Sequence, residues 1–436
     1  RVLILDQGPA LEERHCAHQE AERHCRRCRP CQVTCGWGGA GAFSDGKLTL
    51  TSEFGGFLSD YLHPDALNEL INYVDQLYLS FGAPDYLYGT DQEEVKELQR
   101  KAASAGLSLI PARIRHLGTD NCFYVLQRIF KQLSSRVDIA TDTPVAEVLT
   151  RDRAVEGVKL VTGEVIRSRF VVCSPGRSGA EWFQREASRL GLKGTNNPVD
   201  IGVRVEIPAV LMEPLTSKVY EPKLVYFSPS FDDRIRTFCM NPHGVVVMEN
   251  NGGLITVNGH SYARKKTENT NFALLVSKTF TEPFNEPICY GKNIAGLANM
   301  LGHGVLVQRL GDLLMGRRST RERIQRGMVR PSLEEATPGD LSLVLPYRHL
   351  CSLIEMLEAL DKLVPGINSS HTLLYGIEVK FYSFRVQVNS ALQTDIRHLF
   401  AIGDGAGITR GLIQSSASGV IAARQIACSL GNNGGE

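Results

Sequence analysis

The sequence lacks several features that define specialised protein classes. It has no apolar run of about 18 residues, the length a membrane helix needs, and its first residues lack the layout of a signal peptide. It also has no excess of charge of one sign, because 48 basic and 47 acidic side chains leave a formal net charge of +1. Such a balance gives no general attraction to nucleic acid or anionic lipid. We therefore expect a soluble cytoplasmic protein with no nucleic-acid and no membrane partner.

The domain organisation follows from length and from the order of the patterns. At about 150 residues per domain, 436 residues make two or three domain-sized units, and 43% apolar residues are enough for an ordinary globular core. Residues 1–199 alternate helix and strand patterns, residues 200–390 are rich in strand patterns, and residues 391–436 return to a strand and a helix. This order predicts an α/β fold: a three-layer first domain with a parallel sheet, split around an inserted β-rich domain that faces the substrate.

Hydrophobic periodicity predicts the individual elements. A helix with one apolar face is expected from Pro64, and a second is expected with Thr119 or Asp120 as its N-cap. Other helices are expected at 301–315, 349–363 and 413–430. A hairpin is expected at Thr162-Gly163. Strands are expected at 2–5, 137–140, 145–149, 155–161, 165–173, 201–207, 234–240, 245–249, 254–258 and 399–402.

The first predicted strand ends in Asp6. An acidic residue at a strand end fits the position that hydrogen-bonds the ribose of a dinucleotide, and a phosphate-binding GxGxxG then lies about 20 residues earlier. That position precedes Arg1. We therefore expect the chain to begin after its own phosphate-binding turn.

A glycine-rich run occupies residues 36–48. Gly36, Gly38 and Gly41 form a literal GxGxxG, but no strand precedes it, so it does not read as a dinucleotide fingerprint. Glycines still allow a backbone to lie against a flat ligand, and Ser44 and Lys47 could reach phosphate or sugar oxygens. A flexible surface loop is the alternative.

Two segments carry a family resemblance. Residues 394–404, a buried strand ending in Gly403-Asp404, resemble the second FAD-binding motif of flavoprotein oxidoreductases. In that family the aspartate hydrogen-bonds the ribityl chain, and the next helix directs its positive end at the flavin. Residues 170–176 resemble the Ala-Thr-Gly segment that closes the FAD domain, with Ser-Pro-Gly in its place. Val145 matches the usual backbone contact to adenine.

The resemblance extends over nearly the whole chain. Residues 39–48, 236–239, 378–382 and 403–411 resemble a largely uncharacterised family of FAD-dependent dehydrogenases, whose members carry the N-terminal GxGxxG that this sequence lacks. The resemblance implies a FAD-dependent oxidoreductase that transfers a hydride between flavin and a small organic substrate. The cofactor contacts expected from it and from the glycine-rich run are Asp6, Gly38, Gly39, Gly41, Ser44, Lys47, Val145, Pro175, Gly176, Gly403, Asp404, Gly405 and Gly407.

Five of the eleven cysteines fall in residues 16–35. Cys25, Cys28, Cys31 and Cys35 have the C-x2-C-x2-C-x3-C spacing of bacterial ferredoxins, so an iron–sulfur cluster is one interpretation and zinc held by thiolates is a second. A flavin-linked disulfide between the last two cysteines is a third, and a group of reduced thiols is the fourth.

Arg410 is the strongest catalytic candidate. It follows the Gly-Asp motif, where a fixed positive charge would stabilise anionic reduced flavin. Arg236 and His260 are candidates for substrate binding or proton transfer. Other polar groups with the same potential are Arg264, Glu378, Lys380, Tyr382 and Arg385.

The sequence contains no second nucleotide-binding motif that would indicate the source of electrons. No strand–GxGxxG–helix unit lies between residues 160 and 208, so electrons are expected from transient NAD(P)H, from an electron-donor protein or from the cysteine cluster. Two alternatives remain: a flavin-linked disulfide reductase, and a truncated metal-binding or interaction module without catalysis.

Overall fold

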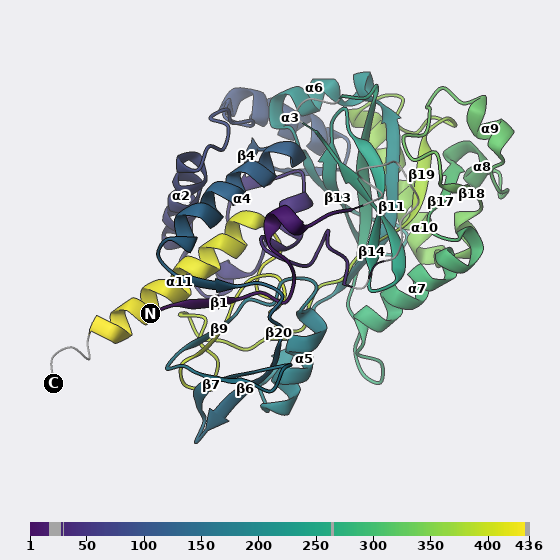
Figure 1. Cartoon of the computed structure of the whole chain (residues 1–436). Helices are drawn as coiled ribbons and strands as arrows, with labels where there is room; N and C mark the ends of the chain where they lie inside the picture. The colour runs from purple at the N-terminus through teal and green to yellow at the C-terminus, as the bar shows by residue number, and fades with distance from the viewer. Residues whose placement is uncertain (17–27, 29, 263–265, 432–436) are drawn as a thin grey trace. The chain divides into compact units, whose positions relative to one another are not determined.

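The structure is a computed structural model that describes residues 1–16, 28, 30–262 and 266–431 (Figure 1). The chain divides into two compact units. The first unit comprises residues 1–85, 115–197 and 382–436, and the second comprises residues 86–114 and 198–381. The segment 86–114 thus belongs to the second unit, although the sequence around it belongs to the first.

Parallel strand pairs are found in the first unit. β1 (Leu3–Leu5) pairs in parallel with β5 (Asp138–Ala140), and β9 (Val171–Cys173) pairs in parallel with β21 (Leu399–Ala401). Within the described part of the chain, no strand joins one pair to the other. The parallel pairing expected for this unit is therefore present as two separate two-stranded sheets.

The rest of the first unit is antiparallel or helical. β6 (Val145–Arg151), β7 (Ala154–Leu160) and β8 (Val165–Arg167) form a three-stranded antiparallel sheet. The predicted hairpin between the last two is confirmed, with Gly163 at a φ of +93°. Other elements are β2 (Lys47–Leu50), β10 (Gly194–Thr195), β20 (Arg385–Val386), α2 (Pro64–Ser80), α4 (Thr119–Ser134), α5 (Ala180–Arg189) and α11 (Leu412–Gly431).

Local sequence explains where these helices begin. Pro64 opens α2 because its fixed φ suits the first helical turn and its missing N–H costs nothing there. Leu67, Leu70, Ile71 and Val74 are buried along one side, as the periodicity predicts. The predicted N-cap of α4 is wrong: the helix begins at Thr119 and its N-cap is Gly118, so neither Thr119 nor Asp120 caps it.

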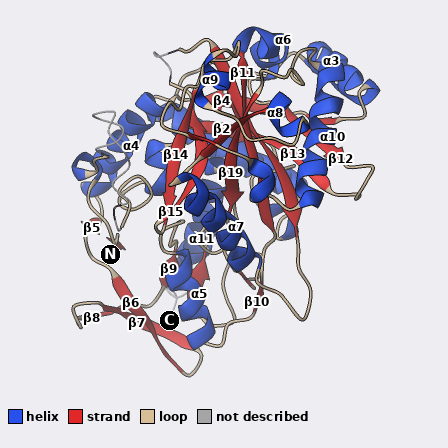
Figure 2. Cartoon of the chain, turned by 90° about the vertical axis from the view of Figure 1, so that its right-hand side faces the viewer, coloured by secondary structure: helices blue, strands red, loops and turns tan. Residues whose placement is uncertain are grey.

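The second unit is built on an eight-stranded sheet, whose strands lie side by side in Figure 2. All its pairings are antiparallel except β17 with β18, so the large sheet is mostly antiparallel. In spatial order the strands are β18 (Thr337–Pro338), β17 (Leu306–Arg309), β19 (Leu373–Lys380), β11 (Val199–Pro208), β16 (Asn269–Lys278), β13 (Arg234–Asn241), β12 (Lys223–Phe227) and β3 (Ser108–Ile110). The α/β class is confirmed as mixed α/β, and the parallel sheet expected from the sequence is not the dominant one.

The two faces of this sheet differ in character. Successive side chains of a strand point to opposite faces, and on β11 both sets are buried. One face carries Val199, Ile201, Val203, Val205 and Ile207 and belongs to the apolar core. That core includes residues of α3 (Gln92–Ser104), α6 (Ala209–Val219), α7 (Pro287–Gly302) and α10 (Tyr347–Leu363). The other face carries Asp200, Gly202, Arg204 and Glu206, and the hairpin of β14 (Val245–Asn251) and β15 (Leu254–His260) contacts it.

One helix predicted from sequence is wrong. Residues 301–315 do not form a single helix: α7 ends at Gly302, β17 follows, and only α8 (Leu310–Leu314) is helical. His303 and Gly304 have φ values of +53° and +159°, which break the helix. The apolar run after them pairs with β19, a contact far away in sequence that periodicity cannot reveal.

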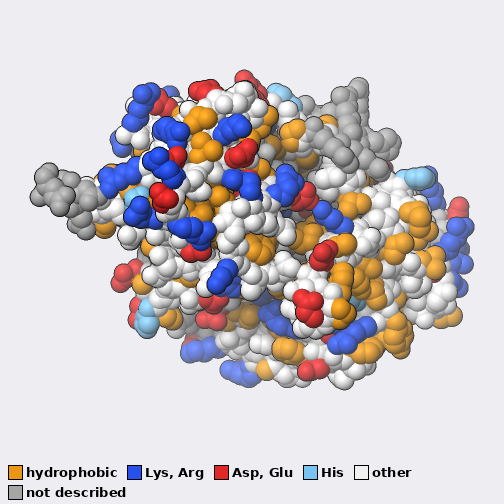
Figure 3. Space-filling model, turned by 90° about the horizontal axis from the view of Figure 1, so that it is seen from below, with side chains coloured by type: hydrophobic (Ala, Val, Ile, Leu, Met, Phe, Trp, Pro, Cys, Tyr) orange, Lys and Arg blue, Asp and Glu red, His pale blue; other side chains and the backbone are white. Residues whose placement is uncertain are grey.

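The surface agrees with the balanced charge of the sequence. On the face shown in Figure 3, basic and acidic side chains are interspersed among hydrophobic ones. Among the described helices, none combines the length and apolar character that a bilayer span requires.

Candidate functional site

Three turns meet at the carboxyl ends of the parallel strands of the first unit. The turn after β1 contains Asp6, whose Oδ1 accepts a hydrogen bond of 2.9 Å from the N–H of Gly8. Burial raises the pKa of Asp6, and this N–H partly offsets the rise. Gln7 Nε2 donates to Ser178 Oγ, 2.9 Å away, in the turn after β9. Two motifs that lie far apart in sequence are therefore neighbours.

The turn after β9 also touches the turn after β21. A Cβ added to Gly405 would lie 2.2 Å from the carbonyl oxygen of Gly176 and 2.7 Å from Pro175, so only glycine fits there. Arg177 Nε donates to Asp404 Oδ2 at 3.1 Å. Gly403 and Gly407 have φ values of +77° and +74°, which the compact turn requires. The structure thus brings together the predicted residues of the Ser-Pro-Gly and Gly-Asp motifs.

The side chain of Arg14 forms hydrogen bonds to the backbone of the glycine-rich run and of the residues just before it. Nothing in the sequence indicated this role for Arg14. Arg14 is 4% exposed, and its guanidinium donates to the carbonyls of Gln32, Val33, Trp37 and Gly39 at 2.5 to 3.0 Å. Burial lowers the pKa of Arg14 to about 10, which leaves it charged at neutral pH. A buried cation among carbonyl oxygens makes this run an anchored loop.

The other predicted residues of the run have local partners. Ser44 Oγ donates to the carbonyl of Gly41 at 2.9 Å. Lys47 Nζ pairs with Asp45 Oδ2 at 2.8 Å, and both side chains are nearly buried. Gly38 packs against α4, since a Cβ there would lie 2.8 Å from Leu126. Elsewhere in the unit, Val145 begins β6 opposite Leu160. Contacts of these residues to a cofactor stay predictions.

Arg410 lies between two aromatic rings. Its Cζ is 3.6 Å from the ring centroid of Tyr382 and 4.6 Å from that of Phe57. Arg385 approaches the same Phe57 ring at 4.3 Å. The backbone sets this geometry, because Arg410 N donates to the carbonyl of Gly55 at 2.8 Å. Phe57 had no signal in the sequence, since its partners are more than 300 residues away.

The cysteine cluster is only partly described. Cys25 lies outside the described residues, as does Arg264 of the substrate candidates. Cys28 is exposed, Cys31 is half-buried, and Cys35 is buried against Gly8, where a Cβ would lie 2.8 Å from its sulfur. Burial raises the pKa of Cys35. In the described ranges, no group of three or more His, Cys, Asp or Glu residues is placed to hold a metal ion, so the four-cysteine metal site stays a prediction.

The polar face of the large sheet centres on a buried ion pair in the second unit. Arg204 and Glu378 are both fully buried, with Nε–Oε2 and Nη2–Oε1 distances of 2.7 and 2.8 Å. Arg204 Nη1 also donates to the side-chain oxygens of Asn241 and Asn271. Burial alone lowers the pKa of Arg204, but the Glu378 carboxylate outweighs it and raises the net pKa. Burial likewise raises the pKa of Glu378, yet Arg204 and Lys380 bring it below its ordinary value, so the pair is ionised.

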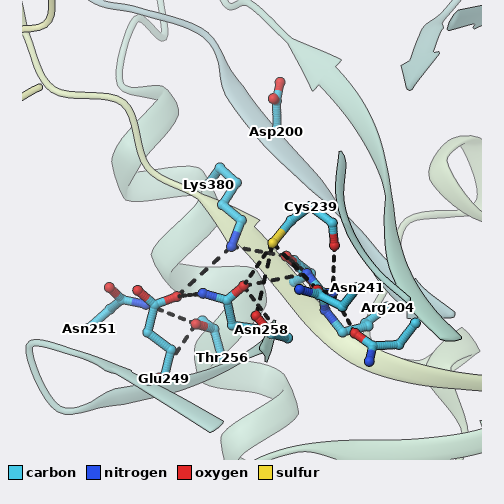
Figure 4. A network of polar contacts seen from close by, with 12 residues as sticks. Asp200, Arg204, Cys239, Asn241, Glu249, Asn251, Thr256, Asn258 and Lys380 are labelled. Carbon is cyan, nitrogen blue, oxygen red and sulfur yellow. Dashed lines mark hydrogen bonds and ion pairs between the residues drawn. The ribbon is translucent and has the colours of Figure 1, made fainter. Parts of the chain in front are cut away.

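Further groups extend this network, which Figure 4 shows from close by. Lys380 Nζ lies 2.9 Å from Glu378 Oε1 and 3.9 Å from Glu249 Oε2. Asn258 Nδ2 donates to the same Glu249 oxygen at 3.0 Å. The amine of Lys380 and the thiol of Cys239 both point toward this group of side chains (Figure 4). The network therefore joins β19, β14, β15 and β13.

The catalytic candidates of the second unit lie on or beside this face. Arg236 Nη2 contacts Asp200 Oδ2 at 2.5 Å, and Ser277 Oγ donates to Asp200 Oδ1 at 2.5 Å. His260 is buried at the end of β15, two residues after Asn258 and so on the same side of that strand. Sequence reasoning identified Arg236, but it missed Asp200 because the two residues meet across the sheet.

A known protein family matches part of the chain. Residues 198–381 match the family described as FAD-dependent protein, C-terminal domain-like. Residues 198–381 are therefore similar to the C-terminal domain of FAD-dependent proteins, and the family resemblance noted in the sequence is confirmed at this level.

Individual relatives are more distant. An uncharacterized protein of Clostridium beijerinckii is 28% identical over 456 residues, which covers 98% of this chain and 76% of that protein. L-proline dehydrogenase from P. horikoshii is 12% identical with a TM-score of 0.38, over 83% of this chain and 78% of its own. Glycine oxidase from Geobacillus kaustophilus is 13% identical with a TM-score of 0.37, over 97% of this chain and 87% of its own.

Proposed function

We propose that this protein is a FAD-dependent oxidoreductase that transfers a hydride between flavin and a small organic substrate. The observation that supports it best is the meeting of the turns after β1, β9 and β21 through Gln7–Ser178 and Arg177–Asp404. Ligands of open α/β sheets bind at the carboxyl ends of the strands, where these turns lie. The family of residues 198–381 supports the same cofactor.

The residues at this place fit the polar parts of FAD. Asp6 and Asp404 are carboxylates that can accept hydrogen bonds from sugar hydroxyls, and the Asp404 side chain is 26% exposed. α11 begins at Leu412, so it is the first helix after the Gly-Asp turn, and its N-terminus is the positive end of its dipole. On this basis we propose that the first unit is the Rossmann-like FAD-binding unit of the protein.

The remaining roles fall to side chains of this chain. When bound, the flavin would supply the atom that accepts or donates the hydride. Arg410, held by Tyr382 and Phe57, provides a fixed positive charge that favours the anionic reduced cofactor. Arg236 and His260, near the polar face of the second unit, bind substrate or move a proton. In the direction that reduces the substrate, the two electrons would come from NAD(P)H or from an electron-donor protein.

FAD binding by the full chain tests this proposal. Titration of purified protein with FAD, followed by flavin fluorescence, is expected to saturate. Asp404→Ala removes an acceptor for sugar hydroxyls and should weaken binding about tenfold or more, because hydrogen bonds to charged groups contribute roughly 1.5–3 kcal/mol. Asp65→Ala is the matched control, since its side chain in the same unit is 87% exposed. Equal affinity of both variants, or no saturable binding by the unaltered chain, would contradict the proposal.

A further inference from the structure

Burying the polar face of the large sheet costs desolvation free energy. Asp200, Arg204 and Glu206 alternate on β11 with five apolar residues, yet all three charged side chains are at most 1% exposed. Apolar side chains on this face would avoid the desolvation of so many charges, and such replacements often leave a protein equally or more stable. A fold that keeps a charged, buried face therefore points to a functional use for it.

Three cations on this face converge on one aromatic ring. Lys223 Nζ, Arg236 Cζ and Lys380 Nζ lie 4.8, 4.7 and 5.7 Å from the ring centroid of Phe238. They come from β12, β13 and β19, so the tertiary fold brings them together. Their side chains are only 5%, 9% and 8% exposed, whereas the Phe238 ring itself is half-buried.

Each of these cations has a carboxylate that fixes its position. Arg236 contacts Asp200 at 2.5 Å, Lys380 contacts Glu378 at 2.9 Å, and Lys223 lies 3.9 Å from Glu221. These carboxylates orient the three cations, which all stay close to the Phe238 ring. Each carboxylate offsets part of the charge of its own cation, and cations held in this way can still donate charge-assisted hydrogen bonds to an anion.

A second observation indicates a missing acceptor in the same network. Asn271 is fully buried and accepts from Arg204, but its Nδ2 has no hydrogen-bond partner among the described residues. Buried amide donors normally find an acceptor in the protein, in ordered water or in a ligand.

We propose that the substrate of this protein carries an anionic group, a carboxylate or a phosphate, which binds beside Phe238 between Lys223, Arg236 and Lys380. Two ammonium groups and a guanidinium suit either anion, because both accept charge-assisted hydrogen bonds. The role as substrate site rests on the proposed oxidoreductase function. The binding of an anion does not, since the residues that would bind it all belong to the second unit.

Calorimetric titration of the full chain without FAD tests the site. Benzoate and inorganic phosphate are the two probes, and neutral benzamide is the uncharged counterpart of benzoate. We expect saturable binding of at least one anion and none of benzamide. Lys380→Met should weaken the anion about tenfold or more, because it removes a charge-assisted contact. Glu378 keeps both bonds from Arg204 in this variant, so the fold should persist.

Two further variants make the result decisive. Lys223→Met removes a second cation from another strand and should weaken the same anion to a similar degree. Lys362→Met, at an exposed position of α10, should change nothing. Failure of both anions to bind, or unchanged affinity in both Lys380→Met and Lys223→Met, would overturn the inference. Anion binding without FAD binding would keep the site and reject the oxidoreductase.

Discussion

The guanidinium of Arg410 stacks on the ring of Tyr382, with its Cζ only 3.6 Å from the ring centroid. Phe57 lies on the same guanidinium and also contacts Arg385, so two cations share one ring. Arg385 is in turn paired with Asp60 at 2.6 Å. The two rings hold the Arg410 guanidinium in one place, because aromatic rings attract cations and carry no net charge themselves.

This stack predicts the effect of Phe57→Leu. The substitution removes the ring that both guanidinium groups contact, so the free energy of unfolding should fall by about 1–3 kcal/mol through lost cation–π attraction and packing. Urea denaturation of the full chain measures the change. Phe284→Leu, at a side chain that is 41% exposed, is the control and should cost much less. Equal costs for the two variants would show that the stack contributes little.

The buried Arg204–Glu378 pair predicts strong coupling. Glu378→Leu leaves the Arg204 guanidinium without its carboxylate and should cost about 3–5 kcal/mol. The double variant Arg204→Met with Glu378→Leu should cost less than the sum of the two single changes, because no uncompensated guanidinium is left in it. Denaturant unfolding of the four proteins gives the coupling energy.

An exposed pair serves as the comparison. Arg100 and Glu97 on α3 are 77% and 42% exposed, so their coupling should be roughly 0–1 kcal/mol. Additive costs at Arg204 and Glu378 would contradict the view that this pair acts as a unit.

His349 predicts a loss of stability in mild acid. Burial lowers its pKa from 6.5 to about 4, and Lys278 and Arg348 add to the effect while Asp233 opposes it. Between these pH values, His349 is therefore protonated in the unfolded chain and neutral in the folded chain. Stability rises with pH wherever the unfolded state binds more protons, so it falls as the pH drops from about 6.5 toward 4, by about 3 kcal/mol in total.

His349→Leu isolates this contribution. Both ring nitrogens of His349 are buried without a hydrogen-bond partner in the described part of the chain, so leucine replaces no hydrogen bond. Chemical denaturation at pH 7 and at pH 5 should show a smaller stability difference in the variant than in the unaltered protein. The same difference in both would mean that other groups govern the acid response.

Sequence patterns predicted those features that depend on neighbours along the chain. β1, α2, the hairpin at Gly163 and the strand before Gly403 all have local signals, and the structure confirms them. Strand-end motifs were visible for the same reason. Features that depend on distant partners were not visible: the helix expected at 301–315 was replaced by a strand that pairs with β19.

The candidate sites divide in the same way. Arg236 and Lys380 were recognised as polar groups, and Phe238 lies in a segment that resembles the family, but Lys223 gave no signal. Only the folded sheet brings the four side chains together. The Arg204–Glu378 pair joins residues 174 positions apart, and Arg14 reaches carbonyls 18 to 25 positions away. Charge, size and periodicity describe single residues, and none of them encodes such pairings.

The carbonyls that converge on Arg14 also determine which way the same peptide groups present their N–H bonds. A trans peptide holds its N–H opposite to its C=O. Since the carbonyls of Trp37 and Gly39 point at Arg14, the N–H groups of Gly38 and Ala40 point away from it. The outer side of the run thus carries the positive ends of backbone dipoles, an arrangement that attracts anions. A phosphate role for this run would then depend on peptide orientation more than on Lys47, whose amine is already held by Asp45.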